Sequence, residues 1–453
     1  MKTKQSKILT LLSLVQMWRF FSHYGARTLM VLFMVQELHY SDARAFGINA
    51  VFCGLVELGG IFGGMIADKY LGLKKGVIIG SCLLGVGYFV LLFETGFFLA
   101  MGVIIAGSSL FVSNITALLG SSYSENDLER KKGFTIFYMM QNLGALASIV
   151  ICSFIATHYS FRLGFAVASM GMIVGNLILF IYRNALKSLG EIPKKRGQIP
   201  LATLLWMSIL VIGTIGVWSE KIVLLLLPWI TGGVLLFFVV RLLKDKRFPR
   251  KEVYTLLIYL SALILFFAVE DQIFSSLLLF AERETHRTLF GWTIPSSFIT
   301  GINPIVILFF GTLIAKRYSA MITPFLLTAC CFGIIAALCL LNLNCSIFGV
   351  MGMVIIISIA EIMIFPLIMS HTSEIAAKGS PGMIMGMVPI AFSLAFQLSG
   401  GLSKMVAIEE RSSSLQVYGG GFGMIALLML LGGVTLQLLM KKVSFVGNAY
   451  EQR

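Results

Sequence analysis

The chain has 453 residues, of which 58% are hydrophobic and 12% are charged, and it carries a formal net charge of +14. Soluble globular domains have about 25% charged residues, so this composition excludes a soluble protein and indicates a polytopic membrane protein. A strongly basic chain can bind nucleic acid. Here, however, the basic residues lie mainly in short loops between apolar runs, so no nucleic-acid partner is expected.

Fourteen apolar runs of the sequence are long enough to cross a membrane as helices, because ~30 Å of hydrocarbon takes about 20 residues. In chain order the runs cover residues 8–36, 43–67, 73–94, 97–122, 131–157, 161–183, 200–218, 221–243, 252–281, 293–315, 319–342, 346–373, 381–407 and 415–440. The first run has a basic start but no small-residue cleavage site, so we expect a retained helix and not a signal peptide.

The lysines and arginines of the loops predict the orientation. With the N-terminus in the cytoplasm, 26 of the 35 basic residues fall in cytoplasmic segments and 7 in outside segments, while Arg19 and Arg27 lie within the membrane. Because cytoplasmic loops of membrane proteins are enriched in Lys and Arg, both termini are predicted to be cytoplasmic. This asymmetry also explains the net charge without nucleic acid.

Two strongly basic loops, 183–199 and 241–251, enclose a pair of plain apolar runs. We interpret this pair as an insertion between two six-helix halves. The predicted domains are therefore a six-helix bundle over 1–184, a two-helix hairpin with basic cytoplasmic linkers over 185–250, and a second six-helix bundle over 251–453. Two such halves around a central cavity are typical of the major facilitator superfamily, although hydropathy alone also fits other transporters or a channel.

Enzyme and metal chemistry find no support in the sequence. The seven cysteines are scattered in or beside apolar runs without the spacing of metal ligands, which is typical of small buried residues. The loops are too short for an enzyme domain and hold no nucleophile–base arrangement or phosphate loop. We therefore expect no catalytic residue, metal or cofactor.

Residues 16–27 hold a glutamine, two arginines, a histidine and a tyrosine inside the first apolar run. At helical spacing Arg19 and His23 are i, i+4 neighbours, Arg27 lies on the side of His23, and Tyr24 lies next to it. An arginine within a membrane helix is costly and normally faces protein or a watery cavity. The arginines either snorkel to the interface or form structural ion pairs, or the stretch lines a polar path through the membrane.

Four carboxylates also lie in the interior of predicted membrane helices, away from their ends, namely Glu57, Glu270, Asp271 and Glu361. Such groups are expensive in lipid unless they are paired, and a carrier coupled to protons needs one that titrates. The candidates for proton coupling or intramembrane ion pairs are these four residues together with Arg19 and His23. The alternatives are ion pairs that join the two halves, and a packed imidazole at His23.

The segment 63–75 reads GGMIADKYLGLKK. It resembles the loop motif of the major facilitator superfamily, in the form used by the proton-dependent oligopeptide transporter family. Its glycines allow close helix packing, and an acid at a helix end can engage a facing helix N-terminus. The resemblance implies a gate element made by Gly63, Gly64, Asp68 and Lys69.

A second segment, 133–144, reads GFTIFYMMQNLG and resembles the fifth-helix signature of the same family, except at Gln141. Segments 279–281, 287–292 and 302–304 are similar as well, so the resemblance covers nearly the whole chain. It implies an all-α fold of the major facilitator superfamily in a bacterial inner membrane. It also implies a monomeric, proton-coupled transporter of di- and tripeptides whose partners are peptide, protons and the lipid bilayer.

The first helix of that family reads Glu-x-x-Glu-Arg-Phe-x-x-Tyr-Gly, often with another arginine two residues on. Here Phe21, Tyr24, Gly25 and Arg27 match, whereas Gln16 and Arg19 replace the glutamates, Phe20 replaces the arginine, and Val112-Ser113 replace a fourth-helix Lys-Pro pair. The chain is therefore identified as a divergent member. The resemblance implies a substrate carboxylate at Arg27 and a substrate amino group at Glu361. The substrate-binding residues that it implies are Tyr24, Arg27, Glu57, Asn142 and Glu361.

Two other functions remain open at this point. The same fold can carry a cationic or siderophore-like solute, in either direction, with altered or lost proton coupling. A degenerate carrier can also act as a membrane sensor or an assembly partner without transport.

Overall fold

The computed structural model describes residues 2–123, 129–186, 189, 199–315, 321–343, 345–379, 381–408 and 414–451. Several basic residues of the predicted cytoplasmic and outside loops lie outside these ranges, namely Lys187, Lys194, Lys195, Arg196, Lys316, Arg317, Arg411 and Arg453.

The described residues are mostly helical. The helices are α1 Lys2–Gln36, α2 Asp42–Ile66, η1 Ala67–Leu71, α3 Leu73–Val90, η2 Glu94–Gly96, α4 Phe97–Gly120, α5 Glu129–His158, α6 Phe161–Tyr182, η3 Arg183–Leu186, α7 Ile199–Trp218, α8 Glu220–Lys244, α9 Arg250–Glu270, η4 Asp271–Phe274, α10 Ser276–Glu284, α11 Phe298–Ala315, α12 Ile322–Leu340, α13 Ile347–Ala377, α14 Pro381–Lys404 and α15 Ser414–Glu451. Each of the fourteen predicted runs contains a helix. Four two-residue strands complete the list: β1 Thr285–His286, β2 Thr288–Leu289, β3 Trp292–Thr293 and β4 Cys345–Ser346.

One predicted helix differs from the structure. The run 252–281 is divided into α9 and α10, which are joined by the short 3₁₀ helix η4 and by Ser275 with φ −131° and ψ −98°. An interrupted helix is tolerated at membrane depth only where other groups bond the freed backbone and its side chains. Side chains of α14, far away in the sequence, form hydrogen bonds with the residues at this break.

Among the described residues, eleven helices are long and apolar enough to cross a membrane. The described parts of α7 and α11 are shorter, and α1 is absent from the eleven, because the polar stretch 16–27 lowers its hydropathy. The number of fourteen crossings and the cytoplasmic position of both termini therefore stay predictions.

The chain forms two compact units. Unit 1 contains Met1–His39 and Leu55–Glu220, and unit 2 contains Tyr40–Gly54 and Lys221–Arg453. Residues of α2 thus belong to both units. This division falls inside the hairpin predicted for 185–250, and the three-part division made from the sequence stays a prediction.

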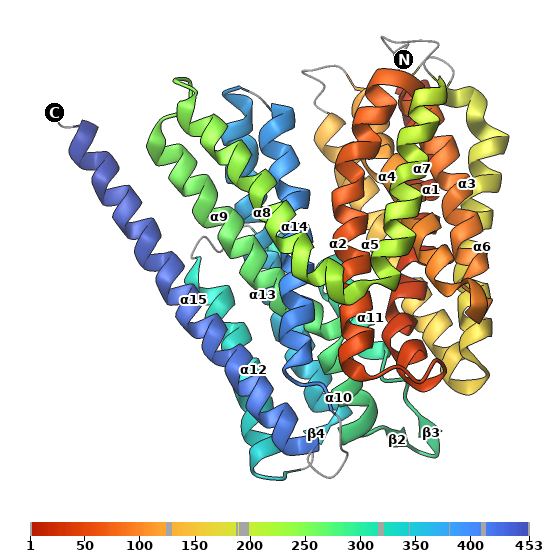
Figure 1. Ribbon diagram of the computed structural model, residues 1–453, viewed down its shortest axis with the longest axis vertical. Helices are drawn as coiled ribbons and strands as arrows, with labels where there is room; N and C mark the ends of the chain where they lie inside the picture. The colour runs from red at the N-terminus through yellow and green to blue at the C-terminus, as the bar shows by residue number, and fades with distance from the viewer. Residues whose placement is uncertain are drawn as a thin grey trace. The chain divides into compact units, whose positions relative to one another are not determined.

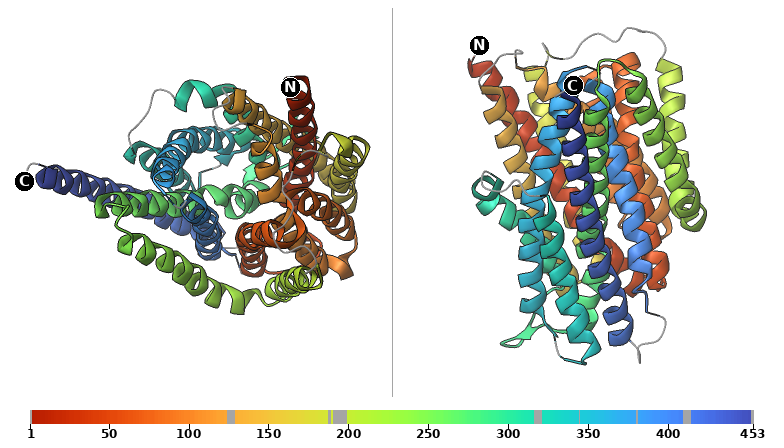
Figure 2. Two further views of the ribbon diagram at one scale, coloured as in Figure 1. Left: turned by 90° about the horizontal axis from the view of Figure 1, so that it is seen from above. Right: turned by 90° about the vertical axis from the view of Figure 1, so that its left-hand side faces the viewer.

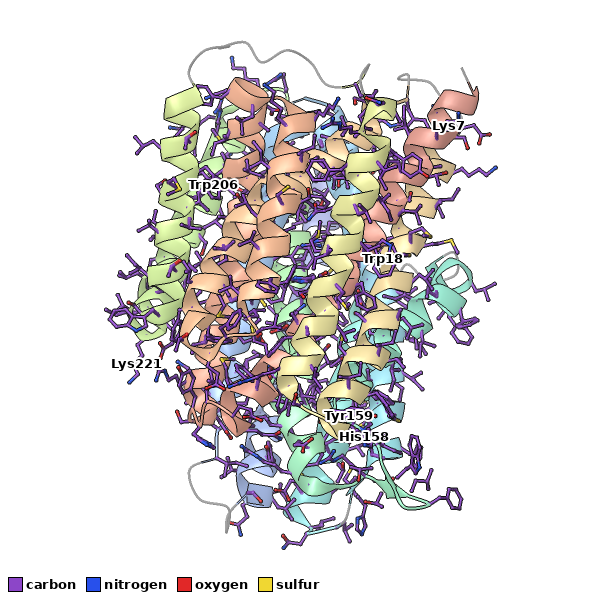
Figure 3. All side chains as sticks on the ribbon, turned by 90° about the vertical axis from the view of Figure 1, so that its right-hand side faces the viewer. Lys7, Trp18, His158, Tyr159, Trp206 and Lys221 are labelled. Atoms are coloured by element: carbon purple, nitrogen blue, oxygen red, sulfur yellow. The ribbon has the colours of Figure 1, made fainter. Side chains whose placement is uncertain are left out.

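Unit 1 is built around α1, which packs between α5 and α6. A Cβ atom on Gly144 of α5 would lie 2.1 Å from the carbonyl oxygen of Met17, so only glycine allows this approach of the two helices. On another side of the unit, α7 packs against α4, and the indole of Trp206 donates to the carbonyl of Ala106 at 3.1 Å (Figure 3).

The two ends of unit 1 hold alternate loops of the chain. Figure 3 shows Lys7 near one end and the turn at His158 and Tyr159 near the other, with Trp18 between them. Gln5 donates to the carbonyl of Ser122 (3.4 Å), and Arg162 forms an ion pair with Glu94 (2.6 Å). These contacts agree with the alternation that the sequence predicts for this part of the chain.

In unit 2, α9 packs against α13, α14 and α15, and α12 lies along α15 (Figure 1). Strand β1 pairs in parallel with β4, and β2 pairs antiparallel with β3. An ion pair between Lys378 and Glu252 (2.7 Å) joins α9 to the end of α13. The core of the unit is rich in phenylalanine, with Phe266, Phe280, Phe325 and Phe332 fully buried.

Candidate functional site

The polar stretch of α1 is buried inside the protein. Gln16, Arg19 and Arg27 are only 2%, 5% and 7% exposed, so neither arginine snorkels to a membrane surface. The guanidinium of Arg19 lies 5.0 Å from the centre of the Phe20 ring. The ring of Tyr24 stacks on Phe20 at 5.6 Å. The stretch is therefore an internal polar site of unit 1.

Side chains from α2 and α3 complete this site. The Nδ1 atom of His23 lies 3.3 Å from the hydroxyl of Tyr88, which is buried in α3. Arg19 and Arg27 interact electrostatically with the half-buried carboxylate of Glu57 on α2 and with the imidazole of His23. The structure thus brings four predicted residues together, and we call Arg19, His23, Arg27, Glu57 and Tyr88 the unit 1 cluster.

Tyr88 is the member of this cluster that the sequence did not reveal. It lies in an apolar run without any motif. The one signal was that a buried tyrosine hydroxyl normally needs a hydrogen-bond partner, which gives no hint of the partner's identity.

Several polar atoms around the unit 1 cluster are not satisfied. Among the described residues, Oε1 of Gln16, Nε of Arg19 and Oγ of Ser22 are buried without a hydrogen-bond partner. Such atoms are rare in folded proteins and each calls for a reason, such as a functional site or a bound molecule. The arrangement can therefore accept further polar groups.

Asn142 is not hydrogen-bonded to this cluster in the part of the chain that the structure describes. Its amide donates to the carbonyl of Tyr138, one turn earlier in α5, at 3.0 Å. Its side chain is half-buried. The predicted role of Asn142 in substrate binding stays a prediction.

The predicted gate residues lie at the end of α2. A Cβ atom on Gly63 would lie 1.9 Å from the carbonyl oxygen of Ser109 in α4, whereas one on Gly64 would find its nearest atom, of Ser113, at 3.6 Å. Glycine is therefore required at the first position only. Asp68 and Lys69 are exposed in the π-helical turn η1, and their role as a gate stays a prediction.

In unit 2, Glu361 of α13 accepts a short hydrogen bond from the amide of Asn303 in α11. Both side chains are half-buried. Asn303 belongs to segment 302–304, which resembles the transporter family in sequence, but no role was predicted for it. Its amide holds one carboxylate oxygen of Glu361 and leaves the other for a further donor.

The helix break holds a dense polar network. Asp271 accepts from the hydroxyl of Ser399 at 2.7 Å, and the amide of Gln272 donates to the hydroxyl and the carbonyl of Ser399 at 3.0 and 3.2 Å. The amide oxygen of Gln272 accepts from Ser276 and Ser403 at 2.6 and 2.8 Å. These bonds tie the break to α14 and indicate a structural role. The neighbouring Glu270 is half-buried, and proton coupling by either acid stays a prediction.

A buried ion pair that the sequence did not reveal lies elsewhere in unit 2. Arg283 of α10 binds both carboxylate oxygens of Asp42, at 2.6 and 2.8 Å, and Asp42 also accepts from the amide of Ile408 at 3.1 Å. Asp42 is only 4% exposed. The sequence analysis did not predict this pair, because its two residues lie 241 positions apart.

Comparison with known proteins decides the family. The family model described as the POT family matches residues 74–419, about three quarters of the chain. The chain belongs to the POT family. The resemblance found in the sequence is therefore confirmed, and the protein is a multi-pass transporter of the bacterial inner membrane and not an enzyme.

Relatives of the chain agree with this membership. The chain is 26% identical to dipeptide and tripeptide permease A of Proteus mirabilis (strain HI4320), over 94% of each chain. It is also 26% identical to dipeptide and tripeptide permease B of Edwardsiella piscicida, over 94% of this chain and 93% of the permease.

Solved structures of POT proteins share its fold. A bacterial homologue of the human drug peptide transporters PepT1 and PepT2 superposes with a TM-score of 0.84 at 23% identity, over 97% of this chain and 99% of that one. Tetrameric PepTSo2 superposes with a TM-score of 0.85 at 23% identity, over 98% and 99%. The predicted all-α fold of the major facilitator superfamily is confirmed.

Proposed function

We propose that this POT-family chain carries small peptides across the inner membrane by alternating access, coupled to protons. The observation that supports this best is the sign of the charges within the membrane spans. Two buried arginines belong to the unit 1 cluster, whereas η4 and α13 of unit 2 hold the carboxylates Asp271 and Glu361. A peptide with a free carboxylate and a free amino group offers charges of opposite sign to these two sets.

Arg27 is the proposed partner of the substrate carboxylate, since its guanidinium can bind a carboxylate through two parallel hydrogen bonds. Glu361 is the proposed partner of the substrate amino group. Its hydrogen bond from Asn303 supports this role, because it fixes the orientation of the carboxylate. Tyr24 and Asn142 are proposed to add hydrogen bonds to the peptide.

Glu57 is the proposed proton carrier, with Asp271 and Glu361 as the other candidates. Its position in the unit 1 cluster supports the choice, because Arg19 and Arg27 act on its charge, whereas Asp271 is already bonded to Ser399. When Glu57 takes up a proton, its negative charge no longer balances the two arginines. Arg27 then attracts a substrate carboxylate more strongly, which links proton binding to substrate binding.

We propose two gates, one at each end of α2. Gly63, Gly64, Asp68 and Lys69 are proposed to act on the cytoplasmic side. The ion pair of Asp42 and Arg283 is proposed to hold the outside ends of α2 and α10 together. A bidentate pair that is largely buried makes a stronger latch than an exposed one.

Uptake by purified protein in liposomes tests the proposal. With a pH gradient that is acidic outside, labelled di- and tripeptides should accumulate above their external concentration. Glu57→Gln should abolish this accumulation and leave exchange of peptide across the membrane intact. Glu374→Gln is the matched control, because the side chain of Glu374 is 66% exposed at the end of α13. Absence of uptake across a broad peptide panel would contradict the peptide claim.

The same experiments separate the alternatives. Structures of a POT family transporter have been solved with 5-aminolevulinic acid and with a thioalcohol-conjugated peptide, so solutes beyond plain peptides belong in the panel. Stabilisation by amines or chelates but not by dipeptides, in a thermal-shift screen, would favour the non-peptide carrier. We propose a monomer as the transporting unit, although PepTSo2 was solved as a tetramer. The number of copies of this chain per particle, measured in nanodiscs, tests the monomer proposal.

A further inference from the structure

The segment between α10 and α11 carries an exposed aromatic hairpin. Strands β2 and β3 pair in register, with Thr288 opposite Thr293 and Leu289 opposite Trp292. Phe290 and Gly291 form the two-residue turn with φ of +50° and +80°. Positive φ at both positions is typical of a type I′ turn, in which Asn or Gly is preferred at the first position.

Phenylalanine breaks this local rule. A bulky residue at positive φ is a conformational outlier that is unfavourable for the backbone, and Phe290 is also 97% exposed. Leu289 and Trp292 beside it are 42% and 65% exposed. A residue that is unfavourable for both the backbone and the solvent is expected where its side chain has a separate function.

The base of the hairpin is firmly held. Arg287 donates to the carbonyl of Ile294 at 3.2 Å and to the carbonyl and carboxylate of Glu282 at 3.1 and 2.7 Å. Just before it, β1 pairs with β4 at the start of α13. The contacts with α10 and with the start of α13 therefore fix the direction in which the hairpin projects.

The hairpin runs sideways from the end of α10, across the direction of the helices in its own unit (Figures 1 and 2). It connects α10, which ends at Glu284, with α11, which begins at Phe298. Both are parts of predicted membrane crossings. A short segment that leaves a crossing helix sideways stays near the membrane surface, where headgroups extend the bilayer from ~30 Å to about 40–45 Å.

We propose that the hairpin is a lipid anchor, in which Leu289, Phe290 and Trp292 insert into the headgroup region of the adjacent leaflet. Trp and other aromatic residues are enriched at this depth, since their rings are apolar while the indole N–H can still meet polar groups. The anchor fixes the height of the outer ends of α10 and α11 in the bilayer. This inference does not rest on the identity of the transported solute.

Trp292 provides a fluorescent probe for the test. The chain holds five tryptophans, so the emission of the natural chain minus that of Trp292→Phe, both in nanodiscs, isolates Trp292. Lipids brominated near the glycerol should quench this difference more than lipids brominated near the chain ends. Quenching by aqueous acrylamide alone would overturn the anchor. Protection that appears only with two copies per nanodisc would also overturn it, in favour of a contact between chains.

Phe290→Asn separates anchoring from folding. Asparagine is favoured at this turn position, so the hairpin should stay formed while its apolar tip is lost. Bromolipid quenching of Trp292 should then fall and acrylamide quenching should rise. Unchanged bromolipid quenching would show that Phe290 is not the anchor and would overturn the proposal for the tip. Gly232→Ala on α8, where a Cβ meets no atom within 4 Å, is the control for a harmless substitution.

Discussion

The unit 1 cluster and the helix break of unit 2 both hold polar side chains within membrane spans, but they differ in how their hydrogen bonds are satisfied. At the break, the side chains of Gln272 and Ser399 are joined to each other and to neighbouring serines. Around the unit 1 cluster, by contrast, Gln16, Arg19 and Ser22 each keep a buried polar atom without a partner among the described residues.

This difference distinguishes polar groups that stabilise the fold from polar groups that are candidates for a function. A fully bonded buried network rigidifies the fold, whereas unsatisfied buried groups cost free energy and call for a reason, such as a functional site or a bound molecule. The difference supports the proposal that the α1 stretch binds a solute or a proton during transport. The break holds α9, α10 and α14 in one arrangement.

The largest expected effect concerns the opposite charges of the two units. Removing one partner of a buried charge pair costs about 2–5 kcal/mol, so Arg27→Gln and Glu361→Gln should each lower peptide affinity at least roughly 30-fold. The measurement is competition binding with capped dipeptides. A C-terminal amide should be insensitive to Arg27→Gln, and an N-acetyl peptide should be insensitive to Glu361→Gln. Equal losses for both capped peptides would contradict the assignment.

The next largest effect is expected in a comparison of two matched glutamine variants. Gln272→Leu removes an amide that bonds Ser399, Ser276 and Ser403, and groups left unsatisfied cost about 1–3 kcal/mol each. The purified protein should therefore melt at a clearly lower temperature. Gln16→Leu should change the melting temperature little, because the oxygen of Gln16 has no partner among the described residues. Equal destabilisation by both variants would remove the distinction between the two regions.

Serine variants test the same distinction with a smaller change. Ser399→Ala deletes the hydroxyl that donates to Asp271 and should cost about 1–3 kcal/mol, since a buried carboxylate oxygen loses its donor. Ser22→Ala deletes a buried hydroxyl without a partner among the described residues and should be neutral or slightly stabilising. Chemical denaturation in mild detergent compares the two. A larger loss for Ser22→Ala would reverse the interpretation.

The smallest effect is expected for an exposed pair outside both regions. The guanidinium of Arg247, 2.6 Å from Asp245, lowers the pKa of that carboxyl to about 2. A depressed folded-state pKa gives a stabilising contribution that is present above the ordinary pKa of about 3.9 and is lost as the pH falls towards 2. Asp245→Asn should therefore lower the melting temperature slightly at pH 6 and not at pH 2. A difference that grows on acidification would contradict this sign.

Much of the fold followed from local properties of the chain. Each apolar run predicted a helix on its own, because the cost of exposed polar backbone in lipid acts on every segment separately. Arg19, Arg27 and Glu57 were recognised in the same way, since a charge inside an apolar run is costly wherever it lies. The family motifs at 63–75 and 133–144 were equally visible in the sequence.

Tertiary structure alone decided which of these groups meet. The bond from Gln272 to Ser399 joins residues 127 positions apart, that from His23 to Tyr88 spans 65, and that from Arg283 to Asp42 spans 241. The break of α9, the satisfied network and the buried ion pair all depend on such partners. No periodicity or motif within one helix carries information on a hydrogen bond to another, because the geometry of that bond exists only after the helices have packed.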